Sequence, residues 1–295
     1  MEPLFALPPG VEPLLEPIRR LSSPLLPQPT SLEPSPPPME GVRAVLFDIY
    51  GTLFVSASGD IGPADRGGRD ETAFRAALEA AGGDAGRLPP GFSGSRRYRE
   101  VIAAHHAAAR ARGVEWPEVE ILEVWEEVLS AAGMAVDLPR LAVEYECRTN
   151  PVWPMPGLLE VVREVVGHGL LVGIVSNAQF YTPLLFPALI GTPLGELGFR
   201  PEFCAWSWRE GEAKPSPRLF AGPLEALREG WGIHPGEVLY LGNDMLKDIL
   251  PAHRLGLRPV LFAGDRRSLR LRPEHPHCRH LSADGVITDL RQLIE

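Results

Sequence analysis

The stretch VRAVLFDIYGT, residues 42–52, decides the fold. Its first six residues form a short, largely apolar run with β-branched side chains, which is typical of a strand buried on both faces in a parallel sheet. Asp48 follows at the carboxyl end of this run, just before a Gly-Thr turn. The sequence therefore predicts a buried parallel strand that ends in an aspartate.

Four similar apolar runs follow at residues 170–175, 203–206, 237–241 and 259–262. From residue 157 onward, stretches with apolar residues three and four apart alternate with these runs, as in GLLEVVREVVGHG at 157–169. The glycines at the end of this example offer a helix stop. Alternation of helices with apolar strands predicts an α/β fold with a layered sheet.

The region between the first two strands, residues 56–155, contains no convincing strand. It carries helical runs near 70–81, 95–112, 117–132 and 138–149, separated by Gly- and Pro-containing segments. The simplest arrangement is a helical domain inserted in a loop of the sheet domain. The sheet domain then comprises residues 41–55 and 156–295.

The first 40 residues hold 12 of the 32 prolines of the chain. Such a segment cannot sustain long helices or central strands. We interpret residues 1–40 as a Pro-rich N-terminal extension that is mobile. A short amphipathic piece around residues 14–21 is the part able to dock on the main body or on a partner.

Composition excludes several classes of protein. With 295 residues, 44% hydrophobic and 23% charged, the chain is globular and long enough for two domains. It has no apolar stretch of membrane-spanning length and no basic head of an export signal, and its net charge of −9 argues against a nucleic-acid partner. Three widely spaced cysteines fit neither a disulfide framework nor a metal clip, so we expect a reducing, cytoplasmic location: Cys147, Cys204 and Cys278. An Arg-rich stretch at 266–272 could contact a phosphate or a partner, but such stretches are more often solvated loops, and we interpret it as one.

Polar residues follow the predicted strands where ligands bind in an open α/β sheet, beyond the carboxyl ends. Asp48 follows the first strand, and Ser176 and Asn177 follow the second. Lys214 lies in the loop after the third strand. Asp244 and Asp248 come after the fourth. This pattern predicts a site for an anionic substrate and a hard cation.

The chemistry of these groups supports that interpretation. Asp48 could attack an electrophile and form an acyl intermediate. Together with Asp244 and Asp248 it supplies the oxygen ligands that magnesium prefers. The Ser176 hydroxyl could hold a phosphoryl oxygen, and Lys214 would neutralise the carboxylates and the developing charge. Each residue alone would be an ordinary turn, cap or surface residue, and it is their agreement at successive strand ends that favours a site.

Four segments, in this order, resemble the motifs of the haloacid dehalogenase-like hydrolase superfamily. They are DIYGT with Asp48, GIVSN with Ser176, AKPSPRLF with Lys214, and YLGNDMLKDI with Gly242 to Asp248. The resemblance implies a Rossmann-like parallel sheet core and a helical cap at 56–155 that closes over the substrate. It implies Asp48 and Lys214 as catalytic residues. The implied substrate-binding residues are Ser176, Asn177, Tyr50 and Thr52, and the implied magnesium ligands are Asp48, Tyr50, Asp244 and Asp248.

Candidate substrate contacts in the cap are the polar residues of its second helical run: Arg96, Arg97, Tyr98, His105 and His106. None of them corresponds to a family motif position.

Tyr50 departs from the pattern of the family's phosphatases, which carry a second aspartate there as general acid and base. An aromatic residue at this position resembles the dehalogenase branch, whose halide leaving group needs no proton and whose members work without metal. The acidic fourth segment instead resembles the magnesium-binding, phosphate-handling branches. We predict a magnesium-dependent hydrolase of a phosphorylated small molecule, acting through an aspartyl-phosphate on Asp48. A metal-free 2-haloacid dehalogenase and a non-catalytic binding protein are the alternatives.

Overall fold

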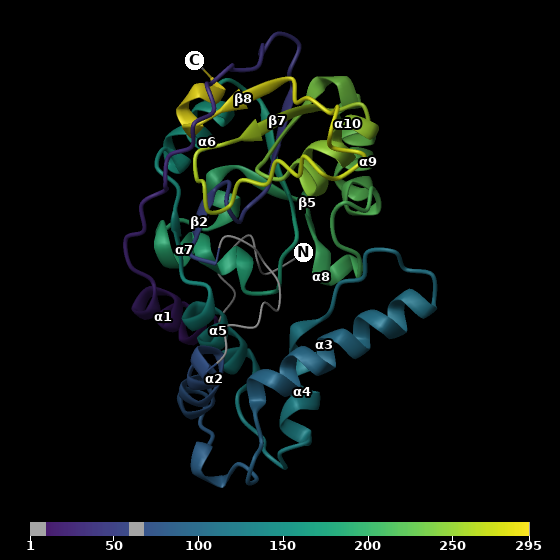
Figure 1. Cartoon of the computed structure of the whole chain (residues 1–295). Coiled ribbons are helices and arrows are strands. Elements are labelled where there is room, and N and C mark those ends of the chain that lie inside the picture. The colour runs from purple at the N-terminus through teal and green to yellow at the C-terminus, as the bar shows by residue number, and fades with distance from the viewer. Residues whose placement is uncertain (1–9, 59–67, 295) are drawn as a thin grey trace.

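The computed structural model describes residues 10–58 and 68–294, so the parts of the predicted extension and cap at 1–9 and 59–67 lie outside the described residues. Among the described residues, six parallel strands form one sheet in the order β5-β4-β1-β6-β7-β8 (Figure 1). Their bounds are β1 Ala44–Phe47, β4 Leu171–Ser176, β5 Phe199–Trp206, β6 Val238–Gly242, β7 Arg258–Phe262 and β8 Gly285–Ile287. The predicted α/β fold with a parallel sheet is confirmed.

Strand β1 lies inside the sheet, between β4 and β6. All of its residues are buried. Val45 and Phe47 join the apolar core on one face, whereas Ala44 and Leu46 join the core on the other. A strand covered on both faces needs apolar residues at every position, which explains the unbroken run in the sequence.

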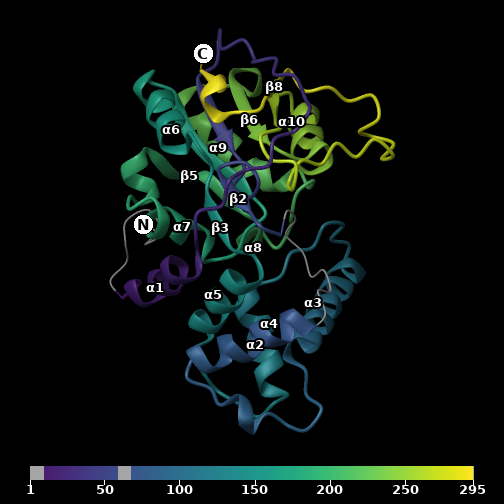
Figure 2. The ribbon, with the colours of Figure 1, turned by 60° about the vertical axis from the view of Figure 1, so that its left-hand side comes forward.

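Helices cover both faces of the sheet (Figure 2). Helices α6 (Leu158–Gly167) and α7 (Leu185–Leu189) share one apolar core with β1, and α9 (Arg218–Trp231) and α10 (Leu250–Arg254) share the other. A short helix, α8 (Ser207–Glu210), follows β5 directly. Within the described parts of the chain, no helix is long and apolar enough to cross a membrane.

Two short strands that the sequence analysis missed flank the helical insert. β2 (Phe54–Ser56) and β3 (Val152–Pro154) pair antiparallel, with Val55 opposite Trp153. The prediction that 56–155 contains no strand is therefore wrong at both ends of the segment. Three-residue strands are too short to give a periodic pattern, and only their pairing across about 100 residues of chain defines them.

The helices of the insert gather at one end of the molecule, away from the sheet (Figures 1 and 2). They are α2 (Gly68–Ala80), α3 (Gly94–Ala111), α4 (Ile121–Ser130) and α5 (Leu138–Thr149). Trp125 is fully buried among them and stacks on both Phe74 and Tyr98, so the insert has an aromatic centre.

Helix α4 starts four residues later than predicted, at Ile121. The residues before it are extended and pair with the loop that precedes Lys214, with Pro117 bridged to Glu212. Tertiary pairing outweighs the local helical tendency of this segment. The insert is thereby tied to the sheet domain at a second place besides β2 and β3.

The described part of the N-terminal extension is packed on the molecule, which differs from the mobile extension that its prolines suggested. Helix α1 (Glu12–Leu21) buries Leu15 and Ile18 against α5 of the insert and α7 of the sheet domain. Further along, Ser35 exchanges two backbone hydrogen bonds with Val286 at the sheet edge, at 2.7 and 2.8 Å. The extension therefore bridges the insert and the sheet domain.

Candidate active site

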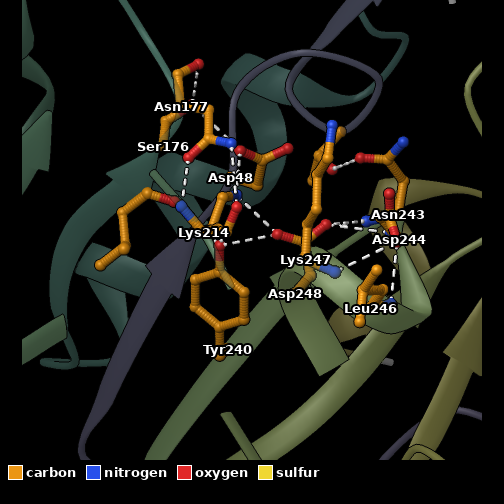
Figure 3. A network of polar contacts seen from close by, with 12 residues as sticks. Asp48, Ser176, Asn177, Lys214, Tyr240, Asn243, Asp244, Leu246, Lys247 and Asp248 are labelled. Atoms are coloured by element: carbon orange, nitrogen blue, oxygen red, sulfur yellow. Dashed lines mark hydrogen bonds and ion pairs between the residues drawn. The ribbon is translucent and has the colours of Figure 1, made fainter. Parts of the chain in front are cut away.

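The carboxyl ends of β4, β1 and β6 are adjacent in the sheet, and polar side chains from all three meet there (Figure 3). Asp48 follows β1, Ser176 ends β4, and Asp248 lies in the turn after β6. Lys214 enters from the loop after α8. Residues predicted separately from four strand ends or loops thus form one network of contacts.

The two carboxylate oxygens of Asp48 have different surroundings, although the residue is only 6% exposed. Oδ1 accepts hydrogen bonds from Ser176 Oγ at 3.0 Å and from Lys214 Nζ at 2.6 Å. Oδ2 accepts none from the residues that the structure describes. One oxygen is therefore held in place while the other is available to a ligand.

The Lys214 ammonium group is buried among three acceptors. Nζ donates to Asp48 Oδ1 and to Asp248 Oδ1, each at 2.6 Å, and to the Tyr240 hydroxyl at 3.0 Å. Burial lowers the pKa of Lys214, but the two carboxylates outweigh burial and raise that pKa above its ordinary value. Lys214 is therefore a fixed positive charge beside Asp48.

Asp248 is held by contacts on both oxygens. Oδ1 lies 3.1 Å from the Tyr240 hydroxyl as well as binding the ammonium group, and Oδ2 accepts the backbone N–H groups of Asn243 and Asp244 at 3.0 and 2.9 Å. Gly242 makes room for this carboxylate, because a Cβ there would lie 2.4 Å from Asp248 Cγ. Burial raises the pKa of Asp248 to about 6.

The carboxylate of Asp244 is taken up by an arginine and by a helix N-terminus. Arg272 donates from Nε to Oδ1 at 2.8 Å and from Nη2 to Oδ2 at 2.5 Å. The backbone N–H groups of Leu246 and Lys247 donate to Oδ1 at 2.8 and 3.1 Å, so Asp244 caps the π-helical turn η5 (Met245–Ile249). Burial raises the pKa of Asp244, but Arg272 outweighs it and holds that pKa below its ordinary value.

The Arg-rich stretch at 266–272 is not simply the solvated loop that was predicted. Arg267 pairs with Asp265, and Arg272 pairs with Asp244, with their side chains 19% and 29% exposed. Sequence could not show this, because the partner of Arg272 lies 28 positions away in a different turn. The stretch therefore belongs to the surroundings of the site.

Tyr50 lies two residues after Asp48 and faces the space in front of the network. Its hydroxyl is 2.9 Å from Thr182 Oγ1. Burial and the nearby carboxylate of Glu146 raise the pKa of Tyr50 well above its ordinary value. The phenol therefore keeps its proton and is paired with a threonine.

The turn between Tyr50 and Thr52 depends on a glycine. Gly51 has a φ of +83°, and a Cβ there would lie 2.5 Å from the Cβ of Ser268. Thr52 is fully buried and donates to Asn243 Oδ1 at 3.2 Å, so it lies behind the site rather than facing it. Its position points to a structural contact between two loops of the network.

Asn177 fixes the loop that carries Lys214. Its Oδ1 accepts the backbone N–H of Lys214 at 2.7 Å, and its Nδ2 lies 3.5 Å from the carbonyl oxygen of the same residue. Asn177 directly follows β4, so this pairing holds the backbone of Lys214 at a fixed position relative to the end of that strand.

Two adjoining cavities lie in front of the network and share Tyr50, Asn177, Lys214 and Lys247 in their walls. The smaller, of about 50 Å³, contains Asp48. The larger, of about 280 Å³, lies between the sheet domain and the insert. A small group can therefore contact Asp48 while the body of a ligand occupies the larger cavity.

Residues 42–256 match the family model of haloacid dehalogenase-like hydrolases. This segment runs from two residues before β1 to two residues after α10, so it includes Asp48, Ser176, Lys214 and Asp248. The chain belongs to this family. The predicted resemblance is confirmed, and the protein is a hydrolase of the haloacid dehalogenase-like type.

Similar proteins include both phosphatases and dehalogenases. The phospholysine phosphohistidine inorganic pyrophosphate phosphatase of Xenopus laevis is 34% identical over 82 residues, which are 28% of this chain and only 27% of that protein. The glyceraldehyde 3-phosphate phosphatase of Pyrococcus furiosus is 28% identical over 197 residues, covering 60% of this chain and 74% of that protein. A solved 2-haloacid dehalogenase from Pseudomonas syringae pv. Tomato DC3000 has a TM-score of 0.53 at 19% identity, over 85% of this chain and 96% of that chain, and shows the shared fold.

In this haloacid dehalogenase-like protein, two of the candidate cap contacts line the larger cavity, namely Tyr98 and His106. Arg99 lines it as well and was missed. Arg97 and His105 instead pair with Glu127, and Arg96 lines a separate surface hollow. Helical periodicity explains the division, because residues 98, 99, 102 and 106 share one face of α3.

Other residues at the site were also missed by the sequence analysis: Tyr240, Lys247, Glu118 and the further tyrosines Tyr145 and Tyr181. Lys247 lies between the two acidic residues of the fourth segment, which was an available signal. Tyr240 sits inside a strand and Glu118 in a segment that looked helical, so neither gave a signal.

Proposed function

We propose that the protein hydrolyses phosphate monoesters of small organic molecules, with Asp48 as the nucleophile. The observation that carries this proposal is the asymmetry of Asp48, whose Oδ1 is fixed by two donors while Oδ2 accepts nothing from the described residues. Such a carboxylate is positioned to attack phosphorus and form an aspartyl-phosphate. The family membership and the phosphatases among the similar proteins support the same chemistry.

The two cavities suit a substrate with an anionic head and an organic body. The smaller cavity is lined by three cationic side chains, Lys214, Lys247 and Arg270, and by three carboxylates, Asp48, Asp244 and Asp248. Lys214 and Arg272 pair with these carboxylates, and Lys247 and Arg270 add positive charge that favours a phosphoryl group beside Asp48. The larger cavity is lined by four tyrosines and by side chains of both charges, and accommodates the remainder of the molecule. Ser176 and Asn177 position the nucleophile and Lys214 rather than supplying charge.

Magnesium is the cofactor that the family resemblance implies, with Asp48, Tyr50, Asp244 and Asp248 as its ligands. The described side chains do not fit a site of three carboxylates, because Asp244 is paired with Arg272 and both oxygens of Asp248 already accept hydrogen bonds. We therefore assign no step of the reaction to a metal ion. The positive charge beside Asp48 is the ammonium group of Lys214.

The test is release of inorganic phosphate from an activated aryl phosphate and a panel of sugar and alkyl phosphates. Asp48→Asn should lower turnover by more than about 10³-fold, because it removes the nucleophile. Asp84→Asn, an exposed change in the insert, is the matched control and should have no effect. Turnover that survives Asp48→Asn would refute the proposal.

Displacement of halide from a short 2-haloacid is the second candidate, and Tyr50 is the observation that favours it. A halide leaves as a stable anion and needs no proton, so this reaction does not require a carboxyl group at the position of Tyr50. Halide release without phosphate release would establish this function. No turnover on either panel would favour a binding protein.

A further inference from the structure

The proposed reaction needs a proton for the leaving group, because an alkoxide is a poor leaving group. The groups that contact Asp48 do not provide it readily. Lys214 is held as a cation by two carboxylates, and the Ser176 hydroxyl donates to Asp48 itself. Tyr50 is a phenol of strongly raised pKa that is paired with Thr182. The proton must therefore come from another wall of the cavities.

The segment before α4 carries a carboxyl group into the larger cavity, at Glu118. The backbone N–H of Glu118 donates to Gly211 O at 3.0 Å, and Ala213 donates to Trp116 O at 2.8 Å. These bonds join the insert to the loop that ends in Lys214, whose side chain lines both cavities. Glu118 is thus fixed relative to Lys214 by backbone pairing, although it belongs to the insert.

The side chain of Glu118 is itself oriented by two hydrogen bonds. Oε1 accepts the backbone N–H of Val119 at 2.9 Å, and Oε2 accepts the Ser207 hydroxyl at 2.8 Å. Protein atoms surround the carboxyl group, yet it remains partly accessible because it faces the cavity. Burial raises the pKa of Glu118 and outweighs the two hydrogen bonds and the charge of Lys247, which lower it. A raised carboxyl pKa suits an acid catalyst.

The other acidic and imidazole groups of this cavity are less suited to the task. Asp70 is paired with Arg99 at 3.4 Å. Glu146 also accepts two hydrogen bonds, from the side chains of Tyr181 and Asn150 at 3.2 and 3.0 Å, but it lies on α5 and not in the segment that pairs with the Lys214 loop. Burial lowers the pKa of His106, so the imidazole holds a proton less firmly than an exposed histidine does. Glu118 combines a carboxyl group with direct attachment to the Lys214 loop.

We propose that Glu118, from the helical insert, is the general acid and base of this site. The inference rests on the proposed phosphatase function. Asp48 Oδ2 attacks phosphorus, the bond from phosphorus to the ester oxygen breaks, and its electron pair stays on that oxygen. Glu118 gives its proton to the oxygen, and the alcohol leaves. Glu118, now a carboxylate, takes a proton from the water that attacks the aspartyl-phosphate, which releases phosphate and restores both carboxyl groups.

The proposal predicts a dependence on the leaving group. Glu118→Gln keeps the size of the side chain but cannot donate a carboxyl proton. With an alkyl phosphate, turnover should fall by about 10²- to 10⁴-fold. With a nitrophenyl phosphate, whose leaving group needs no proton, the first step should be unaffected, and the aspartyl-phosphate burst should keep its wild-type rate. Glu118→Asp retains a carboxyl group and should recover part of the alkyl activity.

Glu115→Gln makes the same change at an exposed position three residues earlier and should leave both rates unaltered. An equal loss in the rate of aspartyl-phosphate formation from both substrates in Glu118→Gln would mean that Glu118 only positions the loop. No loss on the alkyl phosphate would mean that it has no role, and either result overturns the proposal. If wild type releases no phosphate from either substrate, the proposed function itself fails. If Glu118→Gln does not fold, the wild-type dependence of rate on leaving-group pKa decides, since a steep dependence contradicts proton donation.

Discussion

The two sides of the candidate active site are built differently. On the sheet side, the Lys214 ammonium group contacts both Asp48 and Asp248 at 2.6 Å, so it joins the two carboxylates in one network. On the insert side, the cavity wall is made of separate small pairs, such as Arg99 with Asp70 within the insert and Glu118 with Ser207 of the sheet domain. The sheet side is a single charge network in which a change of one member affects the others, whereas the pairs of the insert side are separate from one another.

This difference assigns different tasks to the two sides. A network of buried charges keeps its geometry because breaking any contact leaves a charge unpaired. It suits a reaction centre that must be the same for every substrate. Separate pairs on helices can be exchanged one at a time, which suits the recognition of a particular substrate. Glu118 is the exception on the insert side, because backbone pairing ties its segment to the Lys214 loop and we propose a chemical role for it. Variants on the two sides should therefore differ in the size and kind of their effects.

The largest effect is expected from Lys214→Met on the sheet side. The change leaves Asp48 and Asp248 buried beside each other without a cation, which should lower the free energy of unfolding by about 3 to 5 kcal/mol and abolish turnover. Urea unfolding at pH 7 measures the loss. Arg228→Met removes an exposed pair, with the arginine side chain 58% exposed, and should change stability little.

The stability of Lys214→Met should also depend on pH in a direction that tests the role of the cation. Burial already raises the pKa of Asp248 above its ordinary value, to about 6, and loss of the cation should raise it further. A native state with a raised carboxyl pKa binds more protons than the unfolded state, so stability should increase as pH falls from 8 toward 5. A variant whose stability instead falls over that range would contradict the account.

The next largest effect is expected in the N-terminal extension, which joins the insert to the sheet domain. Leu15 of α1 is fully buried against the insert and the sheet domain, so Leu15→Ala should cost about 2 to 4 kcal/mol of stability. Leu26→Ala is the control, because that side chain is 77% exposed. Thermal unfolding of both variants decides, and similar melting temperatures would mean that the extension does not hold the molecule together.

The sheet side was largely predictable from sequence, and the insert side was not. Asp48, Ser176 and Asp248 could be found because each follows an apolar run, and a parallel sheet brings such strand ends to one edge. Tyr240 could not be found in this way because it lies within β6 and not at its end. On the insert side, the four helical runs were visible in the periodicity, but the face that each turns to the cavity depends on packing between helices.

Long-range pairing explains the remaining errors. The strands β2 and β3 exist only through each other, and the extended segment before α4 exists through its pairing with residues 211–213. The prolines of the extension correctly indicated that its described part has no long helix, but they could not show that Ser35 pairs with Val286. No local pattern reports contacts between residues that are distant in sequence.

A smaller effect is expected on the insert side, from Arg99→Ala. Arg99 lines the larger cavity, whereas Arg97, two residues earlier, pairs with Glu127 on the outside of the insert. Loss of one charged contact to substrate should raise KM about tenfold and leave kcat nearly unchanged. Arg97→Ala should alter neither constant. A fall in kcat without a change in KM would show that Arg99 belongs to the reaction centre instead.

The smallest effect tests whether Arg272 and a metal ion compete for Asp244. Both oxygens of Asp244 accept from the guanidinium group, so magnesium should hardly stabilise the wild-type protein. Arg272→Met leaves that carboxylate without its cation, and an ion at tenfold its Kd would then add about 1.4 kcal/mol, or about 2 to 4 °C in Tm. Potassium chloride at equal ionic strength is the control. A magnesium shift as large in wild type as in the variant would mean that Arg272 gives up Asp244 to the ion, and the three-carboxylate site predicted from the sequence would then hold.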